Sequence, residues 1–535
     1  MPSVTLSEAM ETTCIRHTDL PNTTRLFADL VYHFDRVSKF YRHAPYDYAS
    51  FEAAAKQIEF PVERRAAIVA ALAEQNPGNP SLQLLAEPNG LAVVTGQQVG
   101  LFSGPAYTIF KALAAVRLAA DLTAKGTPAA PVFWLATEDH DLAEINQSWV
   151  FNSSRQPVGL RSCSENPACG PVGPIQILDA PLRELREAFA SMPYGTEIDE
   201  LVTECYQPGI SFGAAFLALL RKLLGKYNIL FLDPLAPAIR ELGAPFLEQA
   251  VQRSADLNHS LLDRSRDLES AGYHSQVHVE SNTSLVFLLE NGRRIALKRQ
   301  GEVFVNGSRS WTSDELVQRS RQLSPNALLR PVMQDYLLPT VAYFGGPAEL
   351  AYFAQSEVLY EALLGRMPVM LHRASFTLLD GRTRKLQDRY RISVTEALIH
   401  ETGLRERIAR SLVPPGLNDH FQSARSRLER DLKELQQELL AFDPSLERAM
   451  TKSAAKMFYQ LEKMQGKAAR QALRKEDQAQ THASYLHNSL YPHRHMQERF
   501  YSILPFLAEY GLGLIDHIYD HVQVQCPDHQ VLPIH

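Results

Sequence analysis

The sequence contains little cysteine and no long uncharged apolar stretch, and each shortage excludes a class of protein. Its five cysteines among 535 residues are odd in number and scattered, which suits reduced thiols better than a disulfide framework. No stretch approaches the roughly 18 apolar residues that a membrane span requires, and the N-terminal sequence lacks the features of a signal peptide. We therefore expect a cytoplasmic protein that does not associate with a membrane.

An excess of positive charge is also missing. The net charge is -6, which argues against nucleic acid as a partner. Cys163 and Cys169 lack both a CxxC spacing and a second pair of ligands, so we expect no metal site there. The length, with 45% hydrophobic and 21% charged residues, indicates an ordinary soluble protein of two or three domains.

Residues 91–111, LAVVTGQQVGLFSGPAYTIFK, predict a strand, a glycine-rich loop and a helix. In open α/β sheets such a loop binds ligands, and a helix N-terminus attracts anions. The spacing matches neither a dinucleotide fingerprint nor a P-loop, so this motif alone leaves a binding loop and a plain tight turn equally open. The candidate binding or catalytic residues are Gly96, Gln97, Gln98, Gly104, Tyr107, Thr108 and Lys111.

A run of ionisable residues follows the next predicted strand, residues 132–136. Such a run is unfavourable after an apolar strand unless the charges are solvated, paired or used in function. If a helix follows, His140 and Glu144 share one face and could form a metal site or a general acid/base with its orienting partner. Acids that complement a helix dipole are the alternative. The candidates here are Glu138, Asp139, His140, Asp141 and Asn146.

The strand–turn–helix pattern recurs at residues 340–355. Gly345 and Gly346 turn the chain and Pro347 begins a helix, and this recurrence favours a binding role for both loops. A further strand is predicted at residues 367–379, where Arg373 could contact a phosphate or carboxylate or form a structural ion pair. The candidates are Tyr343, Gly345, Gly346, Glu349, Tyr352, Gln355, Arg373 and Ser375.

The rest of the chain predicts a division into segments. We expect a helical cap over residues 1–85, a core over 86–400 with an antiparallel β insertion at about 245–320, a helical hairpin with a heptad seam over 405–480, and a helix over 481–535 that returns to the core. Asn291-Gly292 is a hairpin turn signal, and His274 and His278 would share one strand face. Asp233 either faces the binding crevice or shapes an Asp-Pro turn.

Several of these stretches resemble, in this order, the family of bacillithiol biosynthesis cysteine-adding enzymes, the cysteine ligases. They are TGQQVGLFSGPAYTIFK, FWLATEDHDLAEIN, GYHSQVHVE, RPVMQDYLLPTVAYFGGPAELAYFAQ and HRASFTL. The resemblance spans nearly the whole chain. It implies an α/β fold, with a Rossmann-like parallel-sheet core related to class I aminoacyl-tRNA synthetases and nucleotidyl transferases, connective insertions, and a C-terminal antiparallel coiled coil that forms a homodimer.

The resemblance also implies the last step of bacillithiol synthesis, in which the carboxyl of cysteine is joined to the amine of glucosaminyl-malate. A free carboxylate must be activated for this reaction, which suggests ATP with Mg²⁺ and favours a cysteinyl-adenylate over an acyl phosphate. The helix starts at Gly104 and Gly346 would then hold phosphates or carboxylate. Lys111 or Arg373 would offset negative charge, and His140 or Asp139 would accept the proton of the amine.

One departure from the synthetase relatives affects this expectation. Their His-x-Gly-His motif is missing, and Gly104-Pro-Ala-Tyr-Thr stands in its place; nor is there an evident cysteine and histidine cluster to hold zinc against the substrate thiol. Either the phosphate chemistry differs, or ATP is not the activating group. Two other classes remain. One is another group transferase on a Rossmann-like fold that uses a nucleotide or a sugar nucleotide, and the other is a non-catalytic dimeric scaffold, against which the charged run at residues 138–141 argues.

Overall fold

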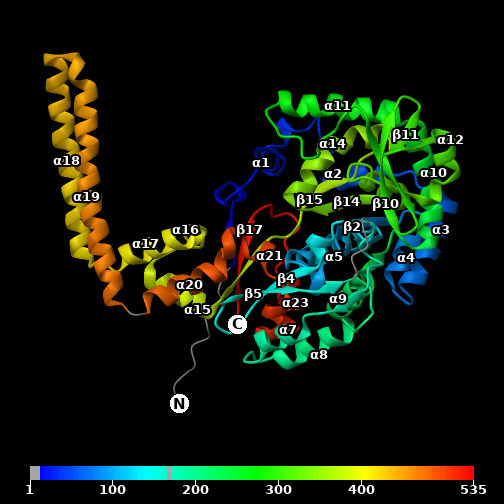
Figure 1. Ribbon diagram of the computed structural model, residues 1–535, viewed down its shortest axis with the longest axis horizontal. Coiled ribbons are helices and arrows are strands. Elements are labelled where there is room, and N and C mark those ends of the chain that lie inside the picture. Colours follow the sequence, from blue (N-terminus) through cyan, green and yellow to red (C-terminus); the bar gives the residue numbers. More distant parts are fainter. Residues whose placement is uncertain (1–11, 165–169, 477) are drawn as a thin grey trace. The chain divides into compact units, whose positions relative to one another are not determined.

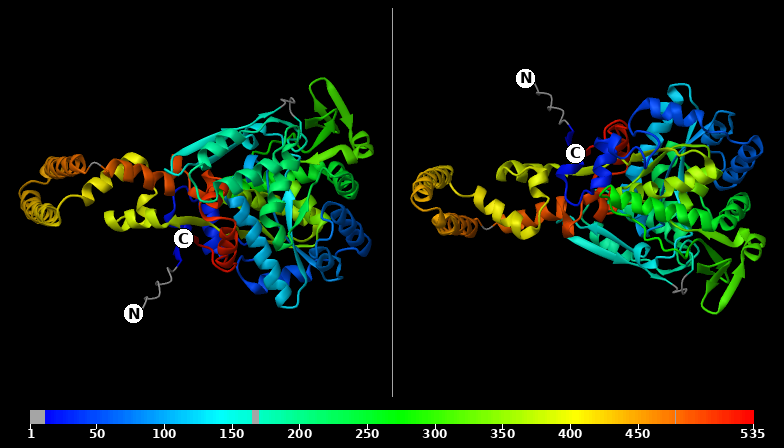
Figure 2. Two further views of the ribbon diagram at one scale, coloured as in Figure 1. Left: turned by 90° about the horizontal axis from the view of Figure 1, so that it is seen from below. Right: turned by 90° about the horizontal axis from the view of Figure 1, so that it is seen from above.

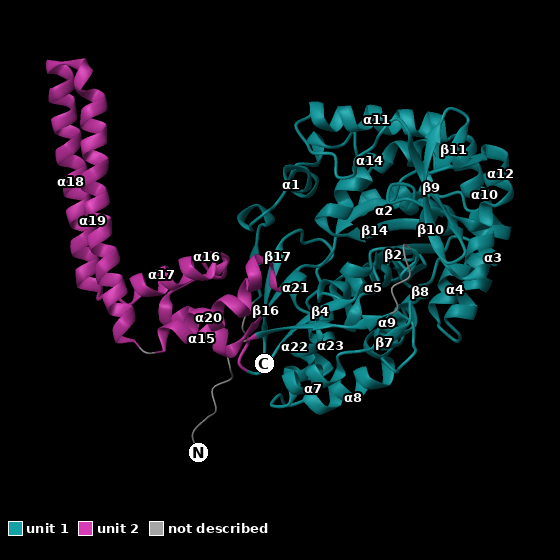
Figure 3. Cartoon of the chain, viewed as in Figure 1, with its two compact units in different colours: residues 1–153, 157–378, 498–534 teal, residues 154–156, 379–497, 535 magenta. Residues whose placement is uncertain are grey.

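The computed structural model describes residues 12–164, 170–476 and 478–535. The chain forms two compact units (Figure 3), unit 1 with residues 1–153, 157–378 and 498–534, and unit 2 with residues 154–156, 379–497 and 535. Cys169, one of the two cysteines considered as metal ligands, lies outside the described residues. Within those residues, no helix is long and apolar enough to cross a membrane.

A five-stranded parallel sheet lies in the middle of unit 1 (Figure 1). Its strand order is β15 (Val369–His372), β14 (Thr340–Gly345), β2 (Leu91–Gln97), β3 (Ala129–Leu135) and β8 (Leu230–Leu232). From β2 the chain adds β3 and β8 on one side, and then places β14 and β15 on the other. The strand order therefore reverses between β2 and β14, which opens a crevice at the carboxyl ends of these two strands.

Helices cover both faces of this sheet because both sets of alternating side chains are apolar. In β2, Leu91 and Val93 pack into one hydrophobic core, while Ala92 and Val94 pack into the other. The first core includes helices α5 (Tyr107–Ala124) and α9 (Phe212–Leu224). The second includes α3 (Val62–Gln75), α10 (Pro237–Gln252), α13 (Arg330–Leu337) and α14 (Pro347–Leu364). The result is the Rossmann-like fold expected from the sequence.

A second sheet, which is antiparallel, lies in the sequence between β8 and β14. Its order is β12 (Arg309–Thr312), β11 (Val303–Asn306), β10 (Arg293–Gln300), β9 (Thr283–Glu290) and β13 (Leu323–Pro325), and Figure 2 shows its green strands standing out from the rest of unit 1. The predicted turn joins β9 to β10, where Asn291 and Gly292 have φ of 52° and 73°. Both residues are therefore in the conformation that a type I′ turn requires.

The strand expected around His274 and His278 is not formed. After α11 (Ser254–Ser270) the chain runs as a loop up to β9. The side chain of Gln355 accepts a hydrogen bond from the backbone N of Val277 and donates one to its carbonyl, each at 2.8 Å. The Gln355 side chain thus satisfies the backbone N–H and carbonyl of Val277 in place of a neighbouring strand.

The strand predicted at residues 367–379 is two strands with different partners. β15 belongs to the parallel sheet, whereas β16 (Phe376–Asp380) joins β1 (Thr13–Ile15) and β17 (His529–Ile534) in the order β1, β17, β16. Arg373 and Ser375 therefore lie in the link between two sheets and not in the middle of a strand. The C-terminal part is likewise not a single helix, because Pro505 starts a new helix, α22 (Leu504–Tyr510), after α21 (Gln497–Phe500).

Unit 2 contains the predicted helical hairpin. Its arms are α18 (Pro415–Phe442) and α19 (Glu447–Lys475), which lie side by side in Figure 1 and are joined by an ion pair of 2.7 Å between Arg425 and Glu462. Few apolar side chains of the two helices are buried, and several remain 42–85% exposed: Leu417, Leu435, Phe442, Met457, Tyr459 and Met464. Two helices alone leave much of a heptad seam uncovered.

Candidate active site

A cavity of about 310 Å³ lies at the crevice between β2 and β14 in unit 1. Its lining comes from the carboxyl ends of β2, β3 and β14, from the first turns of α5 and α14, and from α13 and α21. This is where an open α/β sheet binds its ligand. Of the residues predicted from the sequence, the cavity brings together Gly96, Gln97, Gln98, Tyr107, Lys111, Asp139, Tyr343, Gly346, Glu349, Tyr352 and Arg373.

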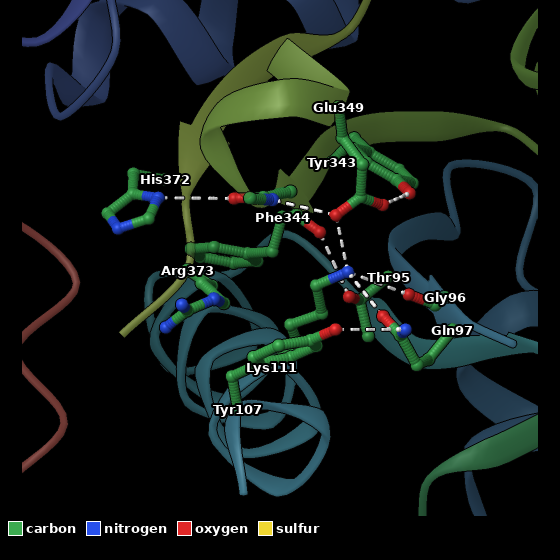
Figure 4. A network of polar contacts seen from close by, with 12 residues as sticks. Thr95, Gly96, Gln97, Tyr107, Lys111, Tyr343, Phe344, Glu349, His372 and Arg373 are labelled. Carbon is green, nitrogen blue, oxygen red and sulfur yellow. Dashed lines mark hydrogen bonds and ion pairs between the residues drawn. The ribbon is translucent and has the colours of Figure 1, made fainter. Parts of the chain in front are cut away.

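An ion pair between Lys111 and Glu349 joins the two sides of the crevice (Figure 4). Lys111 is 1% exposed, and its Nζ also donates to the carbonyl of Gly96 at 3.0 Å and to Oε1 of Gln97 at 2.9 Å. Glu349 accepts from the backbone N of Gly346 at 2.8 Å and from the hydroxyl of Tyr343 at 2.9 Å. The Glu349 carboxylate therefore occupies an amide at the N-terminus of α14 that was expected to hold a substrate anion.

The surroundings of this ion pair shift the pKa values of both side chains. Burial lowers the pKa of Lys111, and attraction by Glu349 offsets only part of that change. Burial raises the pKa of Glu349. The charge and hydrogen bond of Lys111, with the hydrogen bonds from Gly346 and Tyr343, lower it by a larger amount, so the net shift is downward. Glu349 is therefore ionised at neutral pH.

Arginines add positive charge to the cavity wall. Arg330 of α13 donates to the hydroxyl of Tyr352 at 2.6 Å. Arg373 and Arg499 lie 4.9 Å and 6.0 Å from the centre of the Tyr107 ring. Among the residues that the structure describes, Arg499 has no ion-pair partner. A carboxylate or phosphate is the kind of group that such a wall binds.

Arg373 takes the structural role that the sequence left open, and it also faces the cavity. Its guanidinium forms two hydrogen bonds with the buried carboxylate of Glu498, at 2.7 Å and 2.8 Å. Such bidentate pairs fix the plane of the guanidinium.

Asp139 lines the cavity, but the rest of its acidic run does not. Nε2 of Gln98 donates to Asp139 at 2.6 Å and also contacts Glu144. The His140 side chain is 53% exposed, and its Nδ1 lies 3.1 Å from a guanidinium nitrogen of Arg294. His140 is therefore not placed to act on a ligand in the cavity.

The helix after this run explains why His140 and Glu144 do not share a helix face. α6 covers only Leu142–Ile145, because the side chain of Asp141 accepts from the backbone N of Ala143 and of Glu144 and so caps the helix one residue after His140. Glu138 points elsewhere and forms a buried ion pair of 2.7 Å with Arg240. Asp233, left open above, accepts from Thr137 and from the backbone of Leu235, which is turn chemistry.

The remaining predicted residues lie outside the cavity. The short helix η3 (Leu101–Ser103) displaces the start of α5, where the backbone N of Ala106 donates to the carbonyl of Tyr501 at 2.7 Å. The helix start at Gly104 therefore faces Tyr501 and not a substrate. The others have local roles: Thr108 is buried, Asn146 ends α6, Gly345 accepts from the backbone of Arg373, Gln355 holds Val277, and Ser375 contacts Glu498.

Several residues of the site were missed by the sequence analysis. Arg330 lies in a stretch quoted for the family resemblance, but no pattern distinguishes it there. Trp134 reads only as part of an apolar strand. Glu498 and Arg499 follow the helical hairpin, and Glu498 is 125 residues away from Arg373 in the chain. Only a charged pair at the start of an apolar segment could have signalled them.

Comparison with known proteins identifies the same family in both parts of the chain. The family model described as the bacillithiol biosynthesis BshC N-terminal Rossmann-like domain matches residues 10–374, and that of the BshC C-terminal coiled-coil domain matches residues 376–534. A protein of Solibacter usitatus is 52% identical over 98% of this chain and 100% of its own length. Proteins of Koribacter versatilis and Salinibacter ruber are 35% and 30% identical, over 97% and 95% of this chain and 99% and 96% of their own lengths. All three carry the name "Putative cysteine ligase BshC".

Proposed function

The chain belongs to the bacillithiol biosynthesis BshC family, and from that premise we propose that it is a cytoplasmic ligase that joins the carboxyl of cysteine to the amine of glucosaminyl-malate. The observation that carries this proposal is the cation-lined cavity at the crevice between β2 and β14, with Lys111, Arg330, Arg373 and Arg499 in its wall. Both substrates carry carboxylates, which these side chains suit.

ATP is the activating substrate in this proposal. A carboxylate oxygen of cysteine attacks a phosphorus atom of ATP and forms an activated acyl group. The amine then attacks the acyl carbon and loses one proton, and that oxygen leaves together with the phosphorus group. By the adenylate route the products are the amide, AMP and pyrophosphate; by the acyl-phosphate route they are the amide, ADP and phosphate. The same basic wall suits phosphates, and its cations would offset the negative charge that develops.

Asp139 is better suited to Mg²⁺ than to proton transfer. Burial raises its pKa, but hydrogen bonds from Gln98 and from the backbone of His140, with the charge of Arg294, lower it by more, so the net shift is downward. A carboxylate with a lowered pKa is a weak base at neutral pH. Since no group of three metal-binding side chains occurs within the described residues, Mg²⁺ would be held by Asp139 together with the phosphates.

The volume of the cavity is small compared with that of the three substrates. About 310 Å³ is at the lower end of the range for ligand sites. Cysteine, glucosaminyl-malate and ATP together exceed this volume. We therefore propose that the walls of the crevice, which belong to different elements, separate as the second substrate enters.

The helical hairpin is the proposed homodimer contact. Its exposed apolar side chains, such as Met464 at 62% exposure, would be covered by the hairpin of a second copy. Light scattering of the purified protein should give twice the mass of 60.0 kDa. A monomer at micromolar concentration would contradict this contact.

The test of the reaction is a mass-spectrometric assay with cysteine, glucosaminyl-malate, ATP and Mg²⁺ that follows bacillithiol and the nucleotides together. AMP among the products supports the adenylate route, and ADP the acyl-phosphate route. Lys111→Met should lower the rate of product formation by about 100-fold or more, while Lys298→Met, at a side chain 62% exposed on β10, should not lower it. Turnover of a sugar nucleotide without any need for cysteine would refute the proposal, as would the absence of product and nucleotide turnover.

A further inference from the structure

A chain of hydrogen bonds supports the Arg373 guanidinium from behind the cavity wall. Glu498 accepts from both terminal nitrogens of Arg373, from the backbone N of Phe376 at 2.9 Å and from the hydroxyl of Ser375 at 2.8 Å. That hydroxyl lies 2.7 Å from Nδ1 of His529. Nε2 of His529 lies 2.8 Å from the hydroxyl of Thr377. All these side chains are buried.

The direction of each hydrogen bond follows from the charges. Burial raises the pKa of Glu498, but Arg373 and the other partners lower it to about 2, so the carboxylate is ionised and can only accept. The single hydroxyl hydrogen of Ser375 must therefore point to Glu498, which leaves its oxygen to accept from His529. Burial, the largest effect, and the charge of Arg373 lower the pKa of His529 to about 4 although Glu498 opposes them. The ring is thus neutral at pH 7, with its proton on Nδ1.

A second histidine ring and a backbone hydrogen bond lie next to His529. The ring of His17 lies 6.4 Å from that of His529, and burial, the largest effect, lowers the pKa of His17 to about 3. The backbone N of Gln530 donates to the carbonyl of Ser375 at 2.9 Å, which fixes β17 beside the link between β15 and β16. The C-terminal strand is therefore held where its histidine meets the serine.

We propose that His529 is a positioning residue: its Nδ1–H orients the Ser375 hydroxyl toward Glu498, and Glu498 in turn holds the Arg373 guanidinium in the cavity wall to meet an anionic group of the acceptor substrate. The identity of that substrate rests on the proposed function, whereas the proton on Nδ1 does not. Partners one step removed from a ligand-binding group commonly set its orientation. Arg373 itself lies beside Tyr107 and Lys111 in Figure 4.

A matched pair of substitutions separates positioning from simple packing. The side-chain amide of asparagine places a donor near Nδ1, and the longer side chain of glutamine reaches the position of Nε2 instead. We expect His529→Asn to keep the affinity for glucosaminyl-malate within about threefold, and His529→Gln to weaken it by about tenfold, the lower end of the effect of losing such a partner. The KM for cysteine should change in neither variant. Isothermal titration calorimetry with glucosaminyl-malate gives the affinity without turnover.

Equal losses in the two variants, or no loss in either, would overturn the proposal, provided that both keep the wild-type thermal unfolding midpoint. A second measurement uses the ligand-free protein with ¹⁵N-labelled histidine, in which the His529 signals are identified by their absence in His529→Asn. A neutral ring with the proton on Nδ1 is expected, and a proton on Nε2 would also overturn the proposal.

These measurements distinguish failure of the inference from failure of the proposed function. If the wild-type protein neither binds nor converts glucosaminyl-malate, the proposed function is wrong, and the histidine spectrum still tests the hydrogen-bond chain. Inorganic phosphate then replaces the acceptor in calorimetry. Absence of phosphate binding by the wild-type protein would overturn the role of Arg373 as a positioned anion contact.

Discussion

Replacing Lys111 by methionine removes the positive charge that joins the two sides of the crevice and keeps a similar side-chain volume. The partly buried Glu349 then keeps Gly346 and Tyr343 as partners but loses its counter-charge. Breaking a buried ion pair on one side costs about 3–5 kcal/mol. Since the Glu349 side chain is 22% exposed, we expect the free energy of unfolding of unit 1 to fall by about 3 kcal/mol, the lower end of that range.

The double variant Lys111→Met/Glu349→Gln shows whether this loss comes from the uncompensated charge. A neutral amide at residue 349 can still accept from the backbone N of Gly346 through its oxygen and donate through its nitrogen to the hydroxyl of Tyr343. We therefore expect the double variant to be more stable than Lys111→Met by about 2 kcal/mol. Activity should not follow stability. Both variants lack the cation in the cavity, and both should lose about 100-fold or more in kcat.

The assay is urea unfolding followed by tryptophan fluorescence. All three tryptophans of the chain, Trp134, Trp149 and Trp311, lie in unit 1, so the signal reports on that unit by itself. Lys298→Met is the matched control and should unfold like the wild-type protein. If the double variant were no more stable than Lys111→Met, an uncompensated Glu349 charge would not be the cause of the loss.

The pH dependence gives an independent check of the same reasoning. In the wild-type protein the pKa of Glu349 is lowered, so its contribution to stability is complete above the ordinary carboxyl pKa and is lost as the pH falls through the folded-state value. Without Lys111, burial dominates and should raise the pKa of Glu349 above its ordinary value. The stability difference between Lys111→Met and the wild-type protein should therefore shrink below about pH 5.

Further predictions concern single groups of the two units. Arg499→Gln should raise the KM for glucosaminyl-malate about tenfold with kcat little changed, because a charge-assisted contact contributes about 1.5–3 kcal/mol, whereas Arg266→Gln, on an exposed side chain, should leave both constants unchanged. Asp139→Asn should abolish nucleotide turnover in the mass-spectrometric assay, and His140→Ala should retain it; the reverse result would restore His140 as the base. Glu498→Gln should destabilise unit 1 by roughly 3 kcal/mol at pH 7, since the wild-type pKa of about 2 lies well below the ordinary 4.5, and this difference should vanish as the pH falls toward 2. Met464→Glu should shift the protein toward monomer in light scattering without changing tryptophan-monitored unfolding, and an unchanged mass would argue against the hairpin as the dimer contact.

The sequence by itself determined the elements around the site. Apolar β-branched runs, glycine turns and helical spacing are local patterns, and they placed β2, β14, α5 and α14 within a few residues of their observed bounds. The Asn291-Gly292 hairpin and the two arms of the coiled coil follow from equally local rules. Lys111, Asp139 and Glu349 were recognised as candidates because they are ionisable residues at the ends of such elements.

Only the tertiary structure decided which charges meet. Whether Asp139 or His140 faces the cavity depends on where α6 begins, and the side chain of Asp141 sets that point. Whether Ser375 contacts substrate or supports Arg373 depends on β17. This strand brings His529 to Ser375, although the two residues are 154 positions apart in the chain. Hydrogen bonds and ion pairs act over a few ångströms in space and do not depend on separation along the chain. A periodic pattern could therefore predict each wall of the crevice. The ion pair between the walls and the support of Arg373 by Glu498 exist only in the folded chain.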